Sequence, residues 1–165
     1  MRFVLVCDDR PGGDAGAAPE AESIAVHLCL PAERHRPPEA VFAAPAGPAA
    51  ATAKALARSL GLPNPQPRDE LAEAGPVGAW SLIEAERDAR EADATVVLVC
   101  GEALVRGLVC HALGMRPEDG RRFALAPGSL TTIEFRGPRT LIASLNETCH
   151  LEAATGRPQA TQGPK

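Results

Sequence analysis

The sequence predicts an α/β protein with three layers, in which helices cover both faces of a mostly parallel central sheet and an antiparallel hairpin completes the sheet near the C-terminus. Phe3 to Cys7 and Thr95 to Cys100 are continuous apolar runs, as expected for strands that are buried on both faces. Segments with helical periodicity alternate with these strands, which favours parallel pairing. The 165 residues suffice for a single core, so we expect one domain over residues 1–151.

Four helices are predicted between and after the strands. The second one has proline at its first position and Gly61 just beyond its end, a common arrangement at helix termini. In the fourth, the spacing of Leu104, Leu108 and Ala112 places one face against the sheet. The predicted helices span Pro19 to Leu30, Pro48 to Leu60, Trp80 to Ala92 and Glu102 to Leu113.

The last third of the chain predicts a β-hairpin. Leu130 to Phe135 and Thr140 to Leu145 form its strands, joined by residues 136–139 with the sequence RGPR. This hairpin would lie at one end of the sheet, where a free edge could support a homodimer. Residues 152–165 lose apolar periodicity and are expected to form a disordered tail.

Charge and composition exclude several classes of protein. The formal net charge of −4 disfavours a nucleic-acid surface, and no aromatic residues alternate with basic ones. No segment has the length of a membrane span or the pattern of a signal peptide, so a cytoplasmic protein is expected. The five cysteines are odd in number and form no CxxC pair, which indicates neither a disulfide framework nor a zinc knuckle. We therefore expect no cofactor and no metal.

Longer sequence motifs point to a family. The segments VVLVCGEALVRGLVCHALGMRPED and APGSLTTIEFRGPRTLIASLNETCHLE resemble the strand, active-site turn, helix, glycine-serine-leucine hairpin and closing asparagine-to-histidine-leucine segment of the histidine phosphatase superfamily, which has the phosphoglycerate-mutase-like fold. VFAAPAGPAAATAKALARSLGLP is similar to its second strand and following helix. The resemblance runs from about Phe3 to Leu151. The short segment between Glu73 and Thr95 implies a compact member without a lid.

The resemblance also implies that the phosphate-handling residues are replaced. The family's arginine, phosphorylated histidine and glycine after the first strand fall on Cys7, Asp8 and Asp9. Its second arginine falls within residues 47–50, none of them basic, and its second histidine falls on Gly101. The family's proton-donating glutamate corresponds to Glu73. A phosphohistidine mechanism cannot be written for this sequence.

Elementary electrostatics supports an acidic crevice. The resemblance would bring together Asp8, Asp9, Glu73 and Glu102, and Arg10 could offset one of these charges. At 4 Å each carboxylate would repel a phosphate charge by about 1 kcal/mol in water and about 4 kcal/mol in a partly shielded site. We therefore expect a neutral or cationic small-molecule ligand. Cys7, Asp9, Arg10, Cys100 and Gly101 are the predicted ligand-binding residues.

Three functions remain open. In the first, Asp8 and Glu102 act as general acid and base, assisted by Glu73, on a substrate that is not a phosphate ester. In the second, the chain is a non-catalytic pseudophosphatase that binds a metabolite or a partner protein. In the third, Asp8 is the nucleophile of a residual phosphomonoesterase, although it lacks an arginine clamp and a magnesium site.

Each candidate residue also has a structural explanation. Acidic residues after a strand often begin turns, and a glutamate in the first turn of a helix is favoured by the dipole. Cys7 and Cys100 would end neighbouring strands as buried, inert thiols; a metal site from Cys7, Asp8, Cys100 and Glu102 would mix hard and soft ligands. The histidines suit structural or solvated roles: His150 in the closing segment, and His27, His35 and His111 on helices or a loop. A response-regulator receiver fold is excluded, because it needs a lysine directly after its last strand, and the lysines of this chain are Lys54, in a predicted helix, and Lys165, in the tail.

Overall fold

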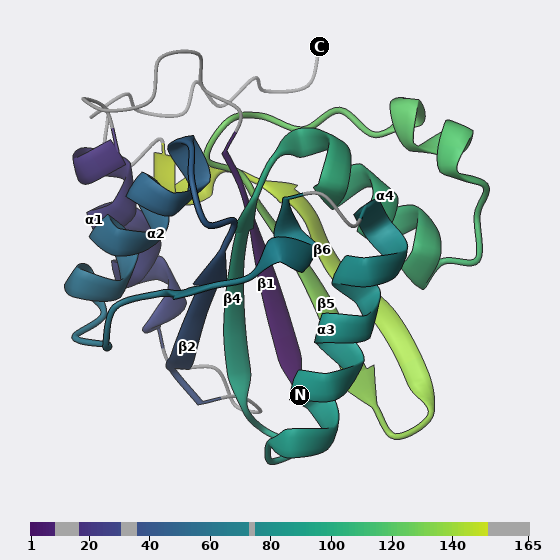
Figure 1. Ribbon diagram of the computed structural model, residues 1–165, viewed down its shortest axis with the longest axis horizontal. Helices are drawn as coiled ribbons and strands as arrows, with labels where there is room; N and C mark the ends of the chain where they lie inside the picture. Colours follow the sequence, from purple (N-terminus) through teal and green to yellow (C-terminus); the bar gives the residue numbers. More distant parts are fainter. Residues whose placement is uncertain (9–16, 31–35, 73–74, 152–165) are drawn as a thin grey trace, which may run out of the picture.

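The computed structural model describes residues 1–8, 17–30, 36–72 and 75–151. These form a six-stranded mixed sheet between two layers of helices (Figure 1). The predicted three-layer α/β/α fold is confirmed. In chain order the elements are β1 (Arg2–Cys7), α1 (Ala17–Leu28), β2 (Pro38–Ala43), α2 (Pro48–Ser59), β3 (Gln66–Pro67), a 3₁₀ turn (Asp69–Leu71), α3 (Gly75–Ala89), β4 (Thr95–Cys100), α4 (Glu102–Ala112), a second 3₁₀ segment (Pro117–Arg122), β5 (Leu130–Arg136) and β6 (Arg139–Glu147).

The two continuous apolar runs occupy the middle of the sheet. The strand order is β3-β2-β4-β1-β5-β6, in which β1 pairs in parallel with β4 and antiparallel with β5. The parallel register aligns Arg2 with Thr95 at one end and Cys7 with Cys100 at the other. Every residue of β4 is buried. This burial explains why these strands are uniformly apolar rather than alternating.

Alternate residues of β1 contribute to two separate cores. Phe3 and Leu5 pack in the core that α3 and α4 cover, together with Leu98 and Leu108. Val4 and Val6 lie in the core on the opposite face, which α1 and α2 cover. Figure 1 shows these two pairs of helices on opposite sides of the sheet. The period of two along a strand thus explains how one short strand stabilises both layers.

Two helices differ from their predicted form. α3 begins at Gly75 rather than Trp80, because a proline, here Pro76, is tolerated in the first turn where its missing N–H costs nothing. In α4 the fully buried residues are Val105, Leu108 and Val109, so the face that packs on the sheet is rotated from the predicted one. Leu104 and Ala112 lie at its margin as partly buried neighbours.

The predicted hairpin is present and slightly longer than expected. β5 and β6 are joined at Arg136 and Arg139 by a two-residue turn. Gly137 has φ 59° there, which suits the tight turns that connect antiparallel strands. β6 forms one edge of the sheet, as predicted.

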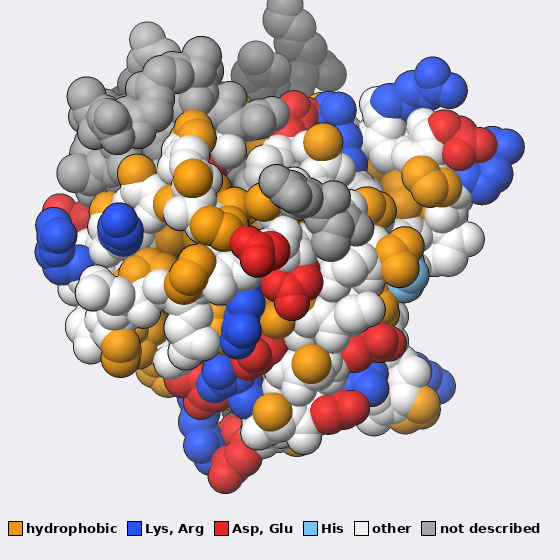
Figure 2. Space-filling view, in the orientation of Figure 1, with side chains coloured by type: hydrophobic (Ala, Val, Ile, Leu, Met, Phe, Trp, Pro, Cys, Tyr) orange, Lys and Arg blue, Asp and Glu red, His pale blue; other side chains and the backbone are white. Residues whose placement is uncertain are grey.

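Surface charges of both signs are interspersed. On the face seen in Figure 2, arginine and lysine side chains stand among carboxylates. Arg90 forms ion pairs with Glu39 and Glu86, each at 2.7 Å, and Arg68 also contacts Glu86. None of the described helices has the length and apolar character needed to cross a membrane.

Gly107 sets the spacing between α3 and α4. A Cβ atom there would lie 2.8 Å from Cβ of Pro76. Glycine to alanine in the interior of a helix normally gains about 1 kcal/mol. We expect Gly107→Ala instead to lower the free energy of unfolding by about 1–3 kcal/mol, because the helices must separate.

Urea denaturation of a double-mutant cycle checks this expectation. In a Pro76→Gly background, which removes the opposing Cβ, the cost of Gly107→Ala should shrink or reverse. An equal cost in both backgrounds would show that the helix contact is not its cause.

Candidate functional site

The carboxyl ends of the parallel strands form one edge of the sheet. Cys7 and Cys100 end β1 and β4, so Asp8 and Gly101 follow side by side. In open α/β sheets this edge is where ligand crevices form. Cys7, Asp8, Cys100 and Gly101 therefore lie at the same edge of the sheet.

Asp8 is the buried acid of this edge. Its side chain is only 5% exposed, and its backbone N–H donates to the carbonyl of Cys100 at 3.0 Å. That bond extends the β1–β4 pairing one residue beyond the strand and fixes the backbone position from which the Asp8 side chain extends. A carboxylate in such a position loses hydration, so it must be stabilised by its surroundings or be used by a ligand.

The two thiols of the edge are structural. Cys7 and Cys100 are directly paired in register and belong to the same core. Burial, followed by the neighbouring Cys7, raises the pKa of Cys100 to about 12. Nucleophilic cysteines need a thiolate, so Cys100 is inert at neutral pH. This agrees with the expectation of buried, unreactive thiols.

Glu102 is engaged in an ion pair. It lies in the first turn of α4, where the helix dipole favours a carboxylate, and its oxygen contacts the guanidinium of Arg106 one turn later. Arg106 also donates to the carbonyl of Phe123 at 2.9 Å. Gly101 is the N-cap and offers no side chain to the crevice. Arg106 was not singled out from the sequence, although the i, i+4 spacing could have indicated it.

Three predicted site residues cannot be placed. Asp9, Arg10 and Glu73 lie outside the described residues. Of the four acids predicted for the site, Asp8 and Glu102 therefore lie within the described residues.

A lysine also lies along this edge. Lys54 of α2 lines a pocket of about 220 Å³ beside the carboxyl ends of β2 and β3. Since β4 separates β2 from β1, normal strand spacing puts this pocket about 10 Å from β1. The sequence placed Lys54 on a helix but gave no reason to connect it with the crevice.

Comparison with known proteins identifies the architecture. Residues 77–148 match the model of the histidine phosphatase superfamily (branch 1). The fold of this chain is that of the histidine phosphatase superfamily. The resemblance predicted from the sequence is thereby confirmed, and the matched segment covers α3 to β6 but not Asp8. No curated protein matches the sequence.

Solved structures give the same result over nearly the whole chain. YhfR from Bacillus stearothermophilus is 14% identical, with a TM-score of 0.71 over 92% of this chain and 99% of its own. A phosphoserine phosphatase mutant from Entamoeba histolytica in complex with phosphoserine is 15% identical, with a TM-score of 0.69 over 91% and 98%. A mycobacterial glucosyl-3-phosphoglycerate phosphatase is 16% identical, with a TM-score of 0.68 over 88% and 98%. At these identities the likeness concerns the fold.

In this histidine phosphatase fold, the glycine-serine-leucine and closing segments support the end of β1. Gly128, with φ 77°, donates its N–H to the carbonyl of Cys7 at 2.7 Å. Asn146 accepts from the N–H of Ala126 at 2.7 Å, and Nε2 of His150 bonds to the Gly128 carbonyl at 2.9 Å. His150 thus has the structural hydrogen bond expected from the sequence. These contacts fix the loop beside Asp8.

Alkylation of the folded protein should distinguish the cysteines. We expect iodoacetamide at pH 8 to modify the exposed Cys29 and Cys149 and to leave Cys7 and Cys100 unmodified, because both are buried. Peptide mapping by mass spectrometry measures each site, with the urea-unfolded chain as the control in which all react. Modification of Cys100 as fast as Cys29 would contradict its burial.

Proposed function

We propose that this protein uses the crevice at the ends of β1 and β4 for acid/base chemistry on a small molecule that is not a phosphate ester, with Asp8 as the acid/base group. The carrying observation is the burial of Asp8 at the end of the central strand. By the family resemblance, this position corresponds to the phosphorylated histidine. A carboxylate there repels phosphate and suits proton transfer or a cationic group.

The backbone geometry supports a positioned group. Asp8 follows directly after β1, and its own N–H and the Cys7 carbonyl are both bonded to neighbouring segments. A general acid or base must be held within hydrogen-bond reach of one substrate atom, which this attachment provides.

A second candidate is a non-catalytic pseudophosphatase that binds a metabolite or a partner protein. The Glu102–Arg106 ion pair favours it, because a carboxylate held by an arginine is less available as the second member of an acid/base pair. Gly101 adds no functional group where the family resemblance would place a histidine. Under this hypothesis Asp8 shapes the binding site without moving a proton.

Hydrolysis of p-nitrophenyl phosphate tests the residual phosphomonoesterase alternative. We expect the protein to release p-nitrophenol no faster than its Asp8→Asn variant, since by the family resemblance the two phosphate-binding arginines fall on Cys7 and within residues 47–50, none of them basic. Asp88→Asn, which changes an exposed acid on α3, is the matched control. A rate that disappears in Asp8→Asn and persists in Asp88→Asn would establish Asp8 as a phosphatase nucleophile and refute the proposal.

Thermal-shift screening tests the proposed ligand class. A ligand at about 100 times its Kd adds about 2.7 kcal/mol to the free energy of unfolding, and each kcal/mol raises the Tm of a chain this size by about 2–4 °C. We expect a neutral or cationic compound to give such a shift with the native chain and with Asp88→Asn, but not with Asp8→Asn. Turnover of that compound, lost in Asp8→Asn, distinguishes the enzyme from the pseudophosphatase. Stabilisation by phosphate esters alone would contradict the proposed ligand class.

A further inference from the structure

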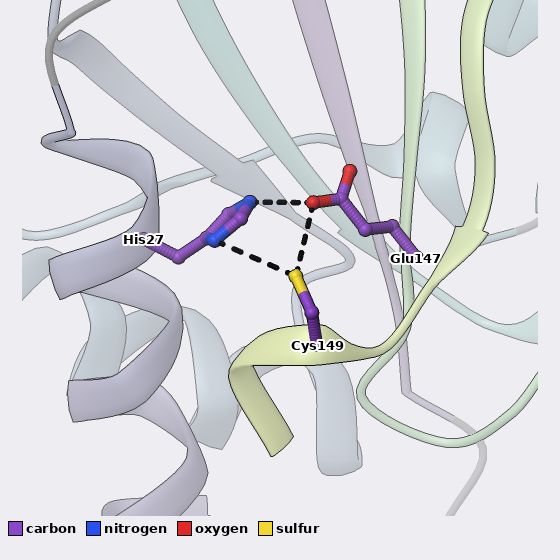
Figure 3. A group of neighbouring side chains, drawn as sticks. All are labelled: His27, Glu147 and Cys149. Atoms are coloured by element: carbon purple, nitrogen blue, oxygen red, sulfur yellow. Dashed lines mark hydrogen bonds and ion pairs between the residues drawn. The ribbon is translucent and has the colours of Figure 1, made fainter. Parts of the chain in front are cut away.

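Three metal-ligating side chains meet at a place remote in sequence. His27 lies in the last turn of α1, Glu147 is the last residue of β6, and Cys149 follows two residues later (Figure 3). Nε2 of His27 lies 2.8 Å from Oε1 of Glu147. The thiol of Cys149 donates to Oε1 of Glu147 at 3.3 Å and lies 3.9 Å from Nδ1 of His27.

We propose that His27, Glu147 and Cys149 form a Zn²⁺ site with an open fourth position. Their nitrogen, oxygen and sulfur donor atoms all lie within 4.8 Å of one another. Zinc bonds of about 2.0–2.3 Å at tetrahedral angles place ligand atoms about 3.3–3.6 Å apart. His27 makes its two contacts through different nitrogens, Nε2 to Glu147 and Nδ1 to Cys149, and only one of them can bind a single ion. Because one donor atom from each residue lies within 4.8 Å of the others, side-chain rotations could bring the three donors around one ion.

The types of ligand atom indicate which metal ion would bind. Mg²⁺ and Ca²⁺ take oxygen ligands and do not favour a thiolate. Zinc is a borderline ion that binds imidazole nitrogen, thiolate sulfur and carboxylate oxygen, and three protein ligands with a vacant position are typical of zinc sites that bind a further molecule.

A second observation points to a ligand beside the cluster. His27, Cys149 and His150 line a pocket of about 410 Å³, which also includes the exposed apolar side chains of Val26 on α1 and of Leu30, two residues beyond its end. His150 bonds through Nε2 to the Gly128 carbonyl, so its Nδ1 carries a lone pair. That buried atom has no hydrogen-bond partner among the described residues. The pocket offers room for a further molecule beside the three side chains.

The same three residues could also make Cys149 a nucleophile activated by His27, but the geometry disfavours this role. Burial, followed by the hydrogen bond to Glu147, raises the pKa of Cys149. The sulfur lies 3.3 Å from the carboxylate and 3.9 Å from the imidazole, whereas a cysteine nucleophile needs its proton transferred to histidine. A metal ion would bind the thiolate directly, so Cys149 would not need to transfer its proton to His27.

Zinc titration of the full-length chain tests the proposal. The protein is stripped with a chelator and titrated with Zn²⁺ against a chromophoric competitor. We expect one equivalent to bind, with affinity reduced about 100-fold or more in Cys149→Ser and in His27→Gln, because loss of a direct ligand should exceed the 10- to 100-fold effect of an outer-sphere change. Cys29→Ser, which changes another exposed cysteine near the end of α1, should bind as the native chain does.

A second measurement does not depend on variants folding. Bound Zn²⁺ should protect Cys149 of the native chain from alkylation and leave Cys29 reactive. Absence of stoichiometric binding, full affinity in Cys149→Ser, equal losses in Cys29→Ser and Cys149→Ser, or no protection of Cys149 would each overturn the proposal. These results are independent of the Asp8 crevice, which has separate assays.

Discussion

The hydrogen bonding of β1 on both sides is the constraint on which the rest of this structure depends. β4 runs parallel to it and β5 antiparallel, so the side chains from Phe3 to Cys7 alternate between two helix-covered cores. Because β1 and β4 end in register, the residues that follow them are forced to the same edge. The position of Asp8 is therefore a consequence of strand pairing before any ligand is considered.

The C-terminal segment holds the end of β1 in place through hydrogen bonds. Gly128 bonds to Cys7 through its N–H and to His150 through its carbonyl, so one residue joins the end of the central strand to the closing segment. A Cβ at Gly128 would approach the Leu151 side chain to 3.2 Å, in a backbone conformation that already favours glycine. The glycine-serine-leucine and closing segments of the C-terminal third thus largely serve to pack and hydrogen-bond the end of β1.

Much of the fold could be predicted from the sequence because its signals are local. The apolar runs and the hairpin carry their structure in consecutive residues, and β1, β4, β5 and β6 lie where expected. The start of α3 was missed because Gly75 and Pro76 indicate a loop when read alone, whereas the contact of Pro76 with Gly107 depends on tertiary packing. The face of α4 that packs on the sheet also depends on tertiary contacts, which is why the sequence did not predict its rotation.

The candidate sites were less predictable, for a related reason. Family resemblance located the crevice but not the engagement of Glu102 by Arg106. Glu147 and Cys149 are close in the sequence, yet His27 lies 120 positions before Glu147, and no local pattern connects it to them. His27 had instead suggested a solvated or capping residue. Only the packing of α1 against the end of β6 brings the three side chains together.

The ion pair of Glu102 limits the chemistry that the crevice could perform. Paired carboxylates suit reactions that need one acid and one base at once, because mutual repulsion separates their pKa values. With Glu102 held by Arg106, this pairing with Asp8 is weakened. A single buried carboxylate better suits a reaction in which the same group removes a proton and returns it, such as an isomerisation. If Asp8 is catalytic, proton shuttling by one group is therefore the mechanism most consistent with the described geometry.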